Sequence, residues 1–206
     1  MTQQQARLFV IAAPSGAGKT TLVKALTTRN PDLRFSISYT TRPKRRNEAD
    51  EVDYLFVDKE RFDELRAAGA LLESAEVFDN FYGTSREQVK EHLDNGHHVI
   101  LEIDWQGAQQ VREAMPECVT IFILPPSREE LENRLRRRGT DTTEVIDRRL
   151  RDALSDMSHW SEFDYVIFND DLDQAVADLE AVLHGTGDKS DTRNQHVRSA
   201  IGEILA

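Results

Sequence analysis

The chain has 206 residues, a hydrophobic content of 39% and a formal net charge of −11 at pH 7. This length favours one domain with room for inserted subdomains, and the apolar content is enough for a buried core. The acidic balance argues against nonspecific binding to nucleic acid or to an anionic membrane, although it permits a local basic pocket for phosphates.

Cysteine content and hydropathy bear on the compartment. The single cysteine, Cys118, lies beside an apolar run, which excludes a disulfide framework and a cysteine-rich zinc site. The histidines show no ligand spacing with acidic or cysteine partners, so no metal or acid–base role is assigned to them. The sequence contains neither a signal-peptide pattern nor an apolar run near 18 residues. We therefore expect a cytoplasmic protein with no membrane partner and no nucleic-acid partner.

The first element is an apolar strand over residues 7–13, and helical spacing over residues 20–28 follows it until Asn30-Pro31. The glycine-containing loop between them ends in Lys19 and Thr20, which is the phosphate-binding P-loop arrangement. Small residues let backbone N–H groups surround a phosphate, Lys19 supplies charge, and the Thr20 hydroxyl suits Mg²⁺. The expected ATP-binding loop comprises Ala13, Pro14, Ser15, Gly16, Ala17, Gly18, Lys19 and Thr20.

Ala13 departs from the P-loop pattern, because it occupies the position of the usual first glycine. A methyl group is tolerable there if φ stays negative. The alternative is a chance glycine-rich turn, against which the flanking strand and helix both argue.

The middle of the chain, from about residue 35 to residue 94, contains short elements whose strands alternate in polarity. We expect an inserted αβ subdomain here. Its predicted elements are strands at 35–38 and 53–57, a helix at 59–68, an extended segment at 71–78, a loop at 80–85 and a helix at 86–94.

A basic loop lies within this insertion. Arg42 and Arg45, three residues apart, could hold an acceptor phosphate together with Tyr54 on the following strand. A kinase requires such an acceptor site, but a solvated run of charges is the alternative for any basic loop.

The second half returns to apolar strands that alternate with helices, which predicts a parallel sheet covered on both faces. The expected strands are 98–103, 118–124 and 165–168, and the expected helices are 106–113, 127–138, 143–159 and 170–184. Residues 139–142 break the pattern between two arginine-bearing helices.

Several motifs in order resemble those of guanylate kinases over roughly residues 7–183. They are SISYTTRPKR (36–45), DYLFV (53–57), YGTS (82–85), EIDWQG (102–107), RGT (138–140) and NDD (169–171), with Glu73 and Arg134 between them. The resemblance implies transfer of the γ-phosphoryl group of ATP to GMP or dGMP, with Mg²⁺. It implies an α/β P-loop core of three layers around a parallel sheet, with a GMP-binding insertion and a helical lid.

The resemblance also implies roles for individual residues. Arg42, Arg45, Tyr54 and Tyr82 would bind the GMP phosphate, and Ser38, Thr84 and Glu73 would contact guanine. Glu102 and Asp104 are placed on the GMP side of the site. Carboxylates at a strand end beside a P-loop suit a water-mediated Mg²⁺ contact or the orientation of an arginine, and Asp104 could also cap the following helix. Arg134 and Asn169 would lie beside adenine. Lys19, Arg42, Arg138 and Arg149 form the expected catalytic set.

Two readings compete with this one. One is a non-catalytic binding module, against which Lys19 and the lid arginines argue. The other is a related sugar-phosphate kinase, against which the guanine-type residues Ser38, Glu73 and Thr84 argue. The basic loop departs from the family pattern because Asn47 and Glu51 occupy usual glycine positions. Asn47 tolerates a left-handed conformation, whereas Glu51 does so poorly, which leaves the role of Arg45 open.

The expected kinase domain covers residues 1–184, with a core of 1–34 and 96–184, the insertion at 35–95 and the lid at about 134–149. Residues 185–206 would form a linker and an amphipathic helix. Val197, Ile201, Ile204 and Leu205 make one apolar stripe on that helix, which Asp191 or Thr192 would cap. Because so short a helix must bury its stripe, it would pack either on its own domain or on a neighbouring subunit. We expect the second, a homo-oligomer contact.

Overall fold

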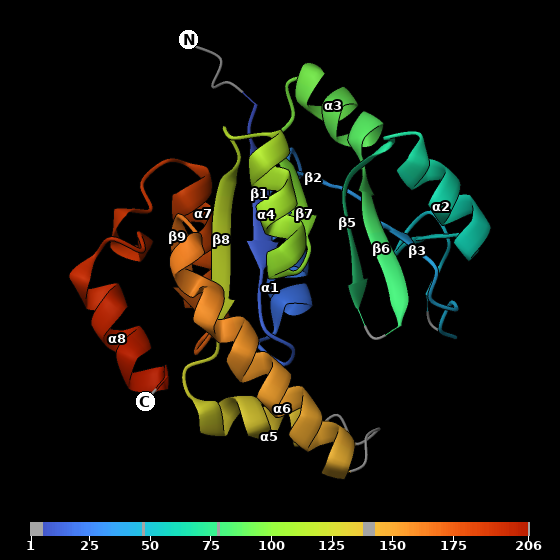
Figure 1. Ribbon diagram of the computed structural model, residues 1–206. Helices are drawn as coiled ribbons and strands as arrows, with labels where there is room; N and C mark the ends of the chain where they lie inside the picture. Colours follow the sequence, from blue (N-terminus) through green and yellow to red (C-terminus); the bar gives the residue numbers. More distant parts are fainter. Residues whose placement is uncertain (1–5, 47, 78, 138–142, 206) are drawn as a thin grey trace. The chain divides into compact units, whose positions relative to one another are not determined.

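The computed structural model describes residues 6–46, 48–77, 79–137 and 143–205 (Figure 1). The chain divides into two compact units. Unit 1 contains the described residues of 1–10, 31–101 and 106–119, and unit 2 contains those of 11–30, 102–105 and 120–206. Within the described ranges, no helix is both long and apolar enough to cross a membrane.

The larger sheet has five strands in the order β2-β7-β1-β8-β9. Strand β2 pairs with β7 in parallel, and β8 pairs with β9 in parallel. The apolar runs that predicted these strands are almost wholly buried, which confirms the expected parallel α/β core. The strands are β1 (Leu8–Ala12), β2 (Arg34–Phe35), β7 (Val99–Glu102), β8 (Val119–Leu124) and β9 (Tyr165–Phe168).

Unit 1 contains a second sheet of four strands in the order β4-β3-β6-β5. The predicted loop at residues 80–85 is in fact strand β6, which pairs antiparallel with both β5 and β3. Of the predicted strand at 35–38, only Phe35 lies in a strand, at the end of β2. Residues 36–38 connect β2 to β3, and there the Ser36 hydroxyl and the Ile37 N–H bond to a side chain on helix α3. The elements are β3 (Tyr39–Thr40), β4 (Leu55–Phe56), α2 (Lys59–Ala67), β5 (Leu71–Val77), β6 (Asn80–Ser85) and α3 (Arg86–Asp94).

The helices of unit 1 begin where the sequence predicts. Asp58 caps α2 by accepting the Arg61 N–H, and Ser85 caps α3 by accepting the Gln88 N–H. Phe62 and Leu65 of α2 pack with Leu71 of β5 in a small apolar cluster. Helix α4 (Trp105–Ala114) belongs to this unit from residue 106 onward.

Unit 2 contains the phosphate-binding loop, and α1 begins at its end. Helix α7 packs on α1 and on β9, and α5 packs on α6 (Figure 1). The predicted helix at 143–159 ends earlier, at Met157, and a 3₁₀ turn follows. The predicted break at 139–142 lies outside the described residues. The elements are α1 (Lys19–Arg29), α5 (Arg128–Arg137), α6 (Thr143–Met157), η1 (Ser158–Glu162), α7 (Leu172–Leu183), η2 (Asp188–Ser190) and α8 (Gln195–Leu205).

The C-terminal helix α8 differs from expectation in two respects. Val197, Ile201 and Ile204 of its stripe are buried within the single chain, so the stripe needs no second subunit to cover it. Neither expected residue caps it: the Thr192 hydroxyl donates to the Phe163 carbonyl, and the Asp191 carboxylate binds Arg193. Thr192 therefore attaches the segment before α8 to residues 163–164, whereas the Asp191 carboxylate bonds within that segment.

Candidate active site

The backbone of the phosphate-binding loop requires glycine at two positions. Gly16 and Gly18 have φ of 93° and 89°. A Cβ on Gly18 would lie 2.4 Å from Asn169 Nδ2, and one on Gly16 would lie 3.0 Å from Leu131 Cδ1. Among the described residues other than glycine, positive φ occurs only at Glu51 and Asp79, so the departure at Ala13 fits as expected. The loop backbone is therefore free to surround an anion at the start of α1.

Lys19 and Thr20 both contact the end of strand β7. Lys19 Nζ donates to the Ile103 carbonyl over 2.7 Å, and Thr20 Oγ1 donates to Glu102 Oε1 over 2.5 Å. A lysine ammonium has three N–H donors and can bond to several oxygens at once. The hydroxyl and the carboxylate are hard oxygen ligands side by side, which suits Mg²⁺ bound mainly by phosphates and water.

Arg134 and Asn169 come together at the same loop. Asn169 Nδ2 donates to the Ala17 carbonyl over 2.6 Å, and Arg134 Nη2 donates to the Asn169 carbonyl over 2.9 Å. Arg134 Nε binds Glu130, and this ion pair lowers the pKa of the Glu130 carboxyl. Two residues predicted for the adenine side are thus attached to the P-loop backbone.

Of the other predicted residues, Arg149 and Asp104 in unit 2 are described by the structure and Arg138 is not. Arg149 lies on α6 and is half-buried, whereas Arg138 falls outside the described residues. Asp104 is half-buried between β7 and α4. The indole of Trp105 donates to Asp156 Oδ1 over 3.1 Å and stacks on the His159 ring at 3.5 Å between centroids. Trp105 thus packs within unit 2.

In unit 1, Arg42 lies among aromatic rings and an acidic side chain. Its guanidinium carbon is 5.3 Å from the centre of the Tyr54 ring, which in turn lies edge-on to the Tyr82 ring at 6.0 Å. Glu48 binds both terminal nitrogens of Arg42 and raises the pKa of the guanidinium, with a further contribution from Tyr82. Three of the four predicted phosphate ligands are therefore gathered in one place.

Arg45, the fourth, stays apart. Its side chain is 74% exposed, and its closest ionic contact is 3.9 Å, from Nη1 to Glu48 Oε1. Glu51 adopts φ of 64°, in the left-handed region that a glutamate tolerates poorly. Its N–H bonds to the Tyr54 carbonyl over 2.9 Å, and this closed turn holds the strained conformation. Asn47, the other departure, lies outside the described residues.

The predicted guanine contacts include a buried acid–hydroxyl pair. Glu73 is 4% exposed, Thr84 is fully buried, and Thr84 Oγ1 donates to Glu73 Oε1 over 2.6 Å. The two residues face each other across β5 and β6. Ser38 is half-buried beside this sheet, and its carbonyl accepts the Leu55 N–H. A buried carboxylate held by a neighbouring hydroxyl is an acceptor that suits a ligand offering N–H donors.

Sequence reasoning assigned no role to three residues that hold these segments. Glu48 engages Arg42 as described. Gln88 Oε1 accepts both the Ser36 hydroxyl and the Ile37 N–H, at 2.9 Å each. Gln110 bonds to both backbone polar groups of Ser74. Single glutamines on exposed-looking helices carry no sequence signal for such contacts, because the partner segments are distant along the chain.

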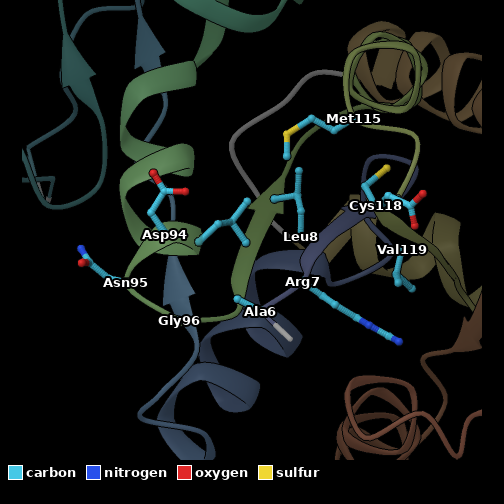
Figure 2. Close-up of a pocket in the computed structure, with 11 residues that line it drawn as sticks. Ala6, Arg7, Leu8, Asp94, Asn95, Gly96, Met115, Cys118 and Val119 are labelled. Carbon is cyan, nitrogen blue, oxygen red and sulfur yellow. The ribbon is translucent and has the colours of Figure 1, made fainter. Parts of the chain in front are cut away.

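A separate open groove of about 1220 Å³ lies in unit 1 where strands β1 and β8 begin. Figure 2 labels Arg7, Asp94, Met115 and Cys118 on its wall. None of the predicted site residues lines it. Its walls mix one cation with carboxylates and apolar groups, an arrangement that does not define a ligand.

Comparisons with known proteins agree with the site. A family model described as guanylate kinase matches residues 5–186. A guanylate kinase of Alkalilimnicola ehrlichii is 52% identical over 198 residues, covering 96% of this chain and 98% of that protein. One from Pseudomonas fluorescens strain Pf0-1 is 52% identical over 206 residues, covering 100% and 98%. The crystal structure of guanylate kinase from Anaplasma phagocytophilum matches with a TM-score of 0.75 and 36% identity, covering 90% of this chain and 88% of that one. On this evidence the chain belongs to the guanylate kinase family.

Proposed function

We propose that the two units divide the ATP-dependent guanylate kinase reaction between them, with the phosphoryl donor held by unit 2 and the acceptor by unit 1. On the donor side, Lys19 and the backbone N–H groups of residues 15–20 bind the ATP phosphates. The Lys19 contact to Ile103 supports this role, because it holds the ammonium at the mouth of the loop. A fixed cation stabilises the charge that develops on the transferring phosphoryl group.

We propose Mg²⁺ as the cofactor, with Thr20 as its protein ligand and Glu102 as the acceptor that orients the Thr20 hydroxyl. The 2.5 Å contact between them supports this assignment. A bound Mg²⁺ ion would neutralise charge on the ATP phosphates. We also propose that Asp104, which follows the same end of β7, serves the GMP side of the site. Arg134 and Asn169 bind near adenine, and Arg138 and Arg149 act on the transferring group from the lid at about 134–149.

On the acceptor side, Arg42, Tyr54 and Tyr82 bind the GMP phosphate, and the exposed Arg45 completes the set when GMP is present. The aromatic surroundings of Arg42 support this role, since they fix the plane of the guanidinium. No general base is needed, because the acceptor phosphate oxygen is already ionised.

Base selection rests on Glu73, with Ser38 and Thr84 as hydroxyl partners. Guanine offers N1–H and an exocyclic amine to a carboxylate, whereas adenine has no N1–H and would leave the buried carboxylate partly unpaired. The buried contact between Thr84 and Glu73 is the single observation that carries the proposal, because it holds an acceptor inside the insertion at 35–95.

The proposed setting is the cytoplasm, with ATP and GMP as the small-molecule partners. A homo-oligomer through α8 also remains a proposal, although the apolar stripe of α8 is already buried within the single chain. The non-catalytic binding module and the sugar-phosphate kinase are not supported, since the relatives that match along the whole chain are guanylate kinases.

A coupled assay with ATP and a panel of GMP, dGMP, AMP, UMP and ribose bisphosphate tests the assignment. Glu73→Ala should lose roughly 2–4 kcal/mol of discrimination between GMP and AMP, because the guanine donors lose their acceptor. Glu76→Ala is the matched control, since Glu76 lies exposed on the same strand. An unchanged ratio of kcat/KM for GMP over AMP in Glu73→Ala would remove Glu73 from the base site.

A further inference from the structure

Strand β5 lies at the end of its sheet, with β6 on one side. At Ser74 a side chain takes the place of a neighbouring strand on the other side. The Ser74 N–H donates to Gln110 Oε1 over 3.0 Å, and Gln110 Nε2 donates to the Ser74 carbonyl over 2.9 Å. The primary amide of Gln110 therefore satisfies both backbone groups that an edge strand leaves unpaired at this residue.

The position of this contact along β5 is informative. Ser74 directly follows Glu73, and the register of β5 against β6 shifts between Leu71 and Glu73. Such an irregularity turns a side chain out of the regular alternation and leaves the strand less restrained by its ladder. Gln110 adds two hydrogen bonds at Ser74, the second residue after the shift.

We propose that Gln110 is a positioning residue for guanine recognition, acting through the backbone of Ser74 on the carboxylate of Glu73. The proposal rests on the role proposed for Glu73. A carboxylate that takes two parallel N–H donors must stay within about 0.5 Å of its productive position. Thr84 holds one oxygen of Glu73, and Gln110 holds the backbone from which the side chain extends.

The chemistry requires an amide at position 110. A methionine has similar length and no strong hydrogen-bonding group, so it would leave both Ser74 groups without this partner. An ionised glutamate accepts but does not donate, and it would face the Ser74 carbonyl with like polarity. A protonated glutamate, in contrast, has one O–H donor and one carbonyl acceptor, as the amide has.

The first experiment compares Gln110→Met with Gln106→Met, whose parent glutamine is exposed on the same helix. For Gln110→Met we expect the KM for GMP to rise about tenfold, the equivalent of one hydrogen bond, while kcat and the KM for ATP change less than about twofold. A purely structural role would lower kcat and stability without this selective effect on GMP. Unchanged KM for GMP in folded Gln110→Met overturns the proposal.

The second experiment uses Gln110→Glu across pH. The ratio of its kcat/KM for GMP to that of the parent should recover as pH falls toward the ordinary glutamate pKa of about 4.3, because the neutral carboxyl restores both bonds. A ratio that is independent of pH overturns the proposal, even if Gln110→Met fails to fold.

Glu73→Gln distinguishes a failure of the proposed base site from a failure of the positioning role of Gln110. If Glu73→Gln leaves the KM for GMP unchanged, the proposed base site itself is wrong and the role of Gln110 falls with it. If Glu73→Gln raises that KM while Gln110→Met does not, the base site stands and only the positioning role of Gln110 fails.

Discussion

The guanidinium of Arg42 binds the carboxylate of Glu48 through two parallel hydrogen bonds, 3.0 Å from Nη1 to Oε2 and 2.7 Å from Nη2 to Oε1. Both side chains are largely covered, at 13% and 15% exposure. Because Glu48 also accepts the Arg45 N–H, one carboxylate closes the basic loop and orients the arginine assigned to the GMP phosphate. The pair is charge-assisted and bidentate, which makes its geometry specific.

This pair predicts a pH dependence of stability. Arg42 holds the pKa of the Glu48 carboxyl below its ordinary value. The stabilisation is therefore fully present above the pKa of the unfolded carboxyl and is lost as pH falls through the lowered folded pKa. We expect Glu48→Gln to lower Tm at pH 7 and to match the parent in the acid range below both pKa values. Thermal unfolding of Glu48→Gln and of the control Glu76→Gln from pH 7 to pH 3 measures this, and a Tm difference that persists unchanged at pH 3 would contradict it.

Lys19 should matter for the chemical step and not for GMP binding. Lys19→Met removes a cation that is most valuable in the transition state, so kcat should fall roughly 10³-fold or more. Lys24→Met is the matched control, because Lys24 is exposed on the same helix. Calorimetry should give the same GMP affinity for Lys19→Met as for the parent. Loss of GMP affinity together with activity would show that donor and acceptor residues do not act separately.

The contact between Trp105 and Asp156 predicts an unusual effect of an amide. Burial raises the pKa of the Asp156 carboxyl, with Asp104 and Asp152 adding to it. The carboxyl pKa is higher in the folded protein than in the unfolded chain. The protein therefore loses stability as pH rises through the pKa of the folded state, and this loss is absent below the pKa of the unfolded chain. Asp156→Asn removes the charge and keeps an oxygen acceptor for the indole, so its Tm should equal or exceed the parent's at pH 7.

The gain in Tm should vanish near pH 3, where both proteins are neutral at position 156. Asp156→Leu is the comparison, because it leaves the indole N–H without this acceptor and should lower Tm at either pH. If Asp156→Asn is less stable than the parent at pH 7, the charge itself stabilises the protein, and burial of the ionised carboxyl is not destabilising.

The parts predictable from sequence are those in which the cause is local. The apolar runs at 98–103 and 118–124 form strands because both faces are buried, and Gly16 and Gly18 are required by the backbone of one loop. The prediction of a loop at residues 80–85 is wrong, because their polarity is typical of a loop whereas pairing with β3 and β5 makes them a strand.

Contacts between distant segments could not be predicted in this way. Nothing local to Gln110 indicates Ser74, 36 residues away, as its partner. Glu51 adopts a left-handed conformation because the surrounding turn requires it, against its own preference. The role of Glu73 came only from the resemblance to guanylate kinases, because by itself it would be an ordinary surface glutamate. For Arg42, the spacing of the basic loop indicated a phosphate site but left a solvated run of charges as the alternative.

The C-terminal segment should stabilise its own chain. Ile201 of α8 is fully buried, Thr192 bonds to the Phe163 carbonyl, and Arg128 binds the Leu205 carbonyl. Ile201→Ala should cost about 2–5 kcal/mol of unfolding free energy in denaturant melts, whereas Ser199→Ala on the exposed face should be near neutral. A chain that ends at Asp188 should unfold at lower temperature and sediment in the same oligomeric state as the parent. If that chain keeps the parent's Tm but sediments as a smaller species, α8 serves an interface between subunits and its burial within one chain is not what stabilises it.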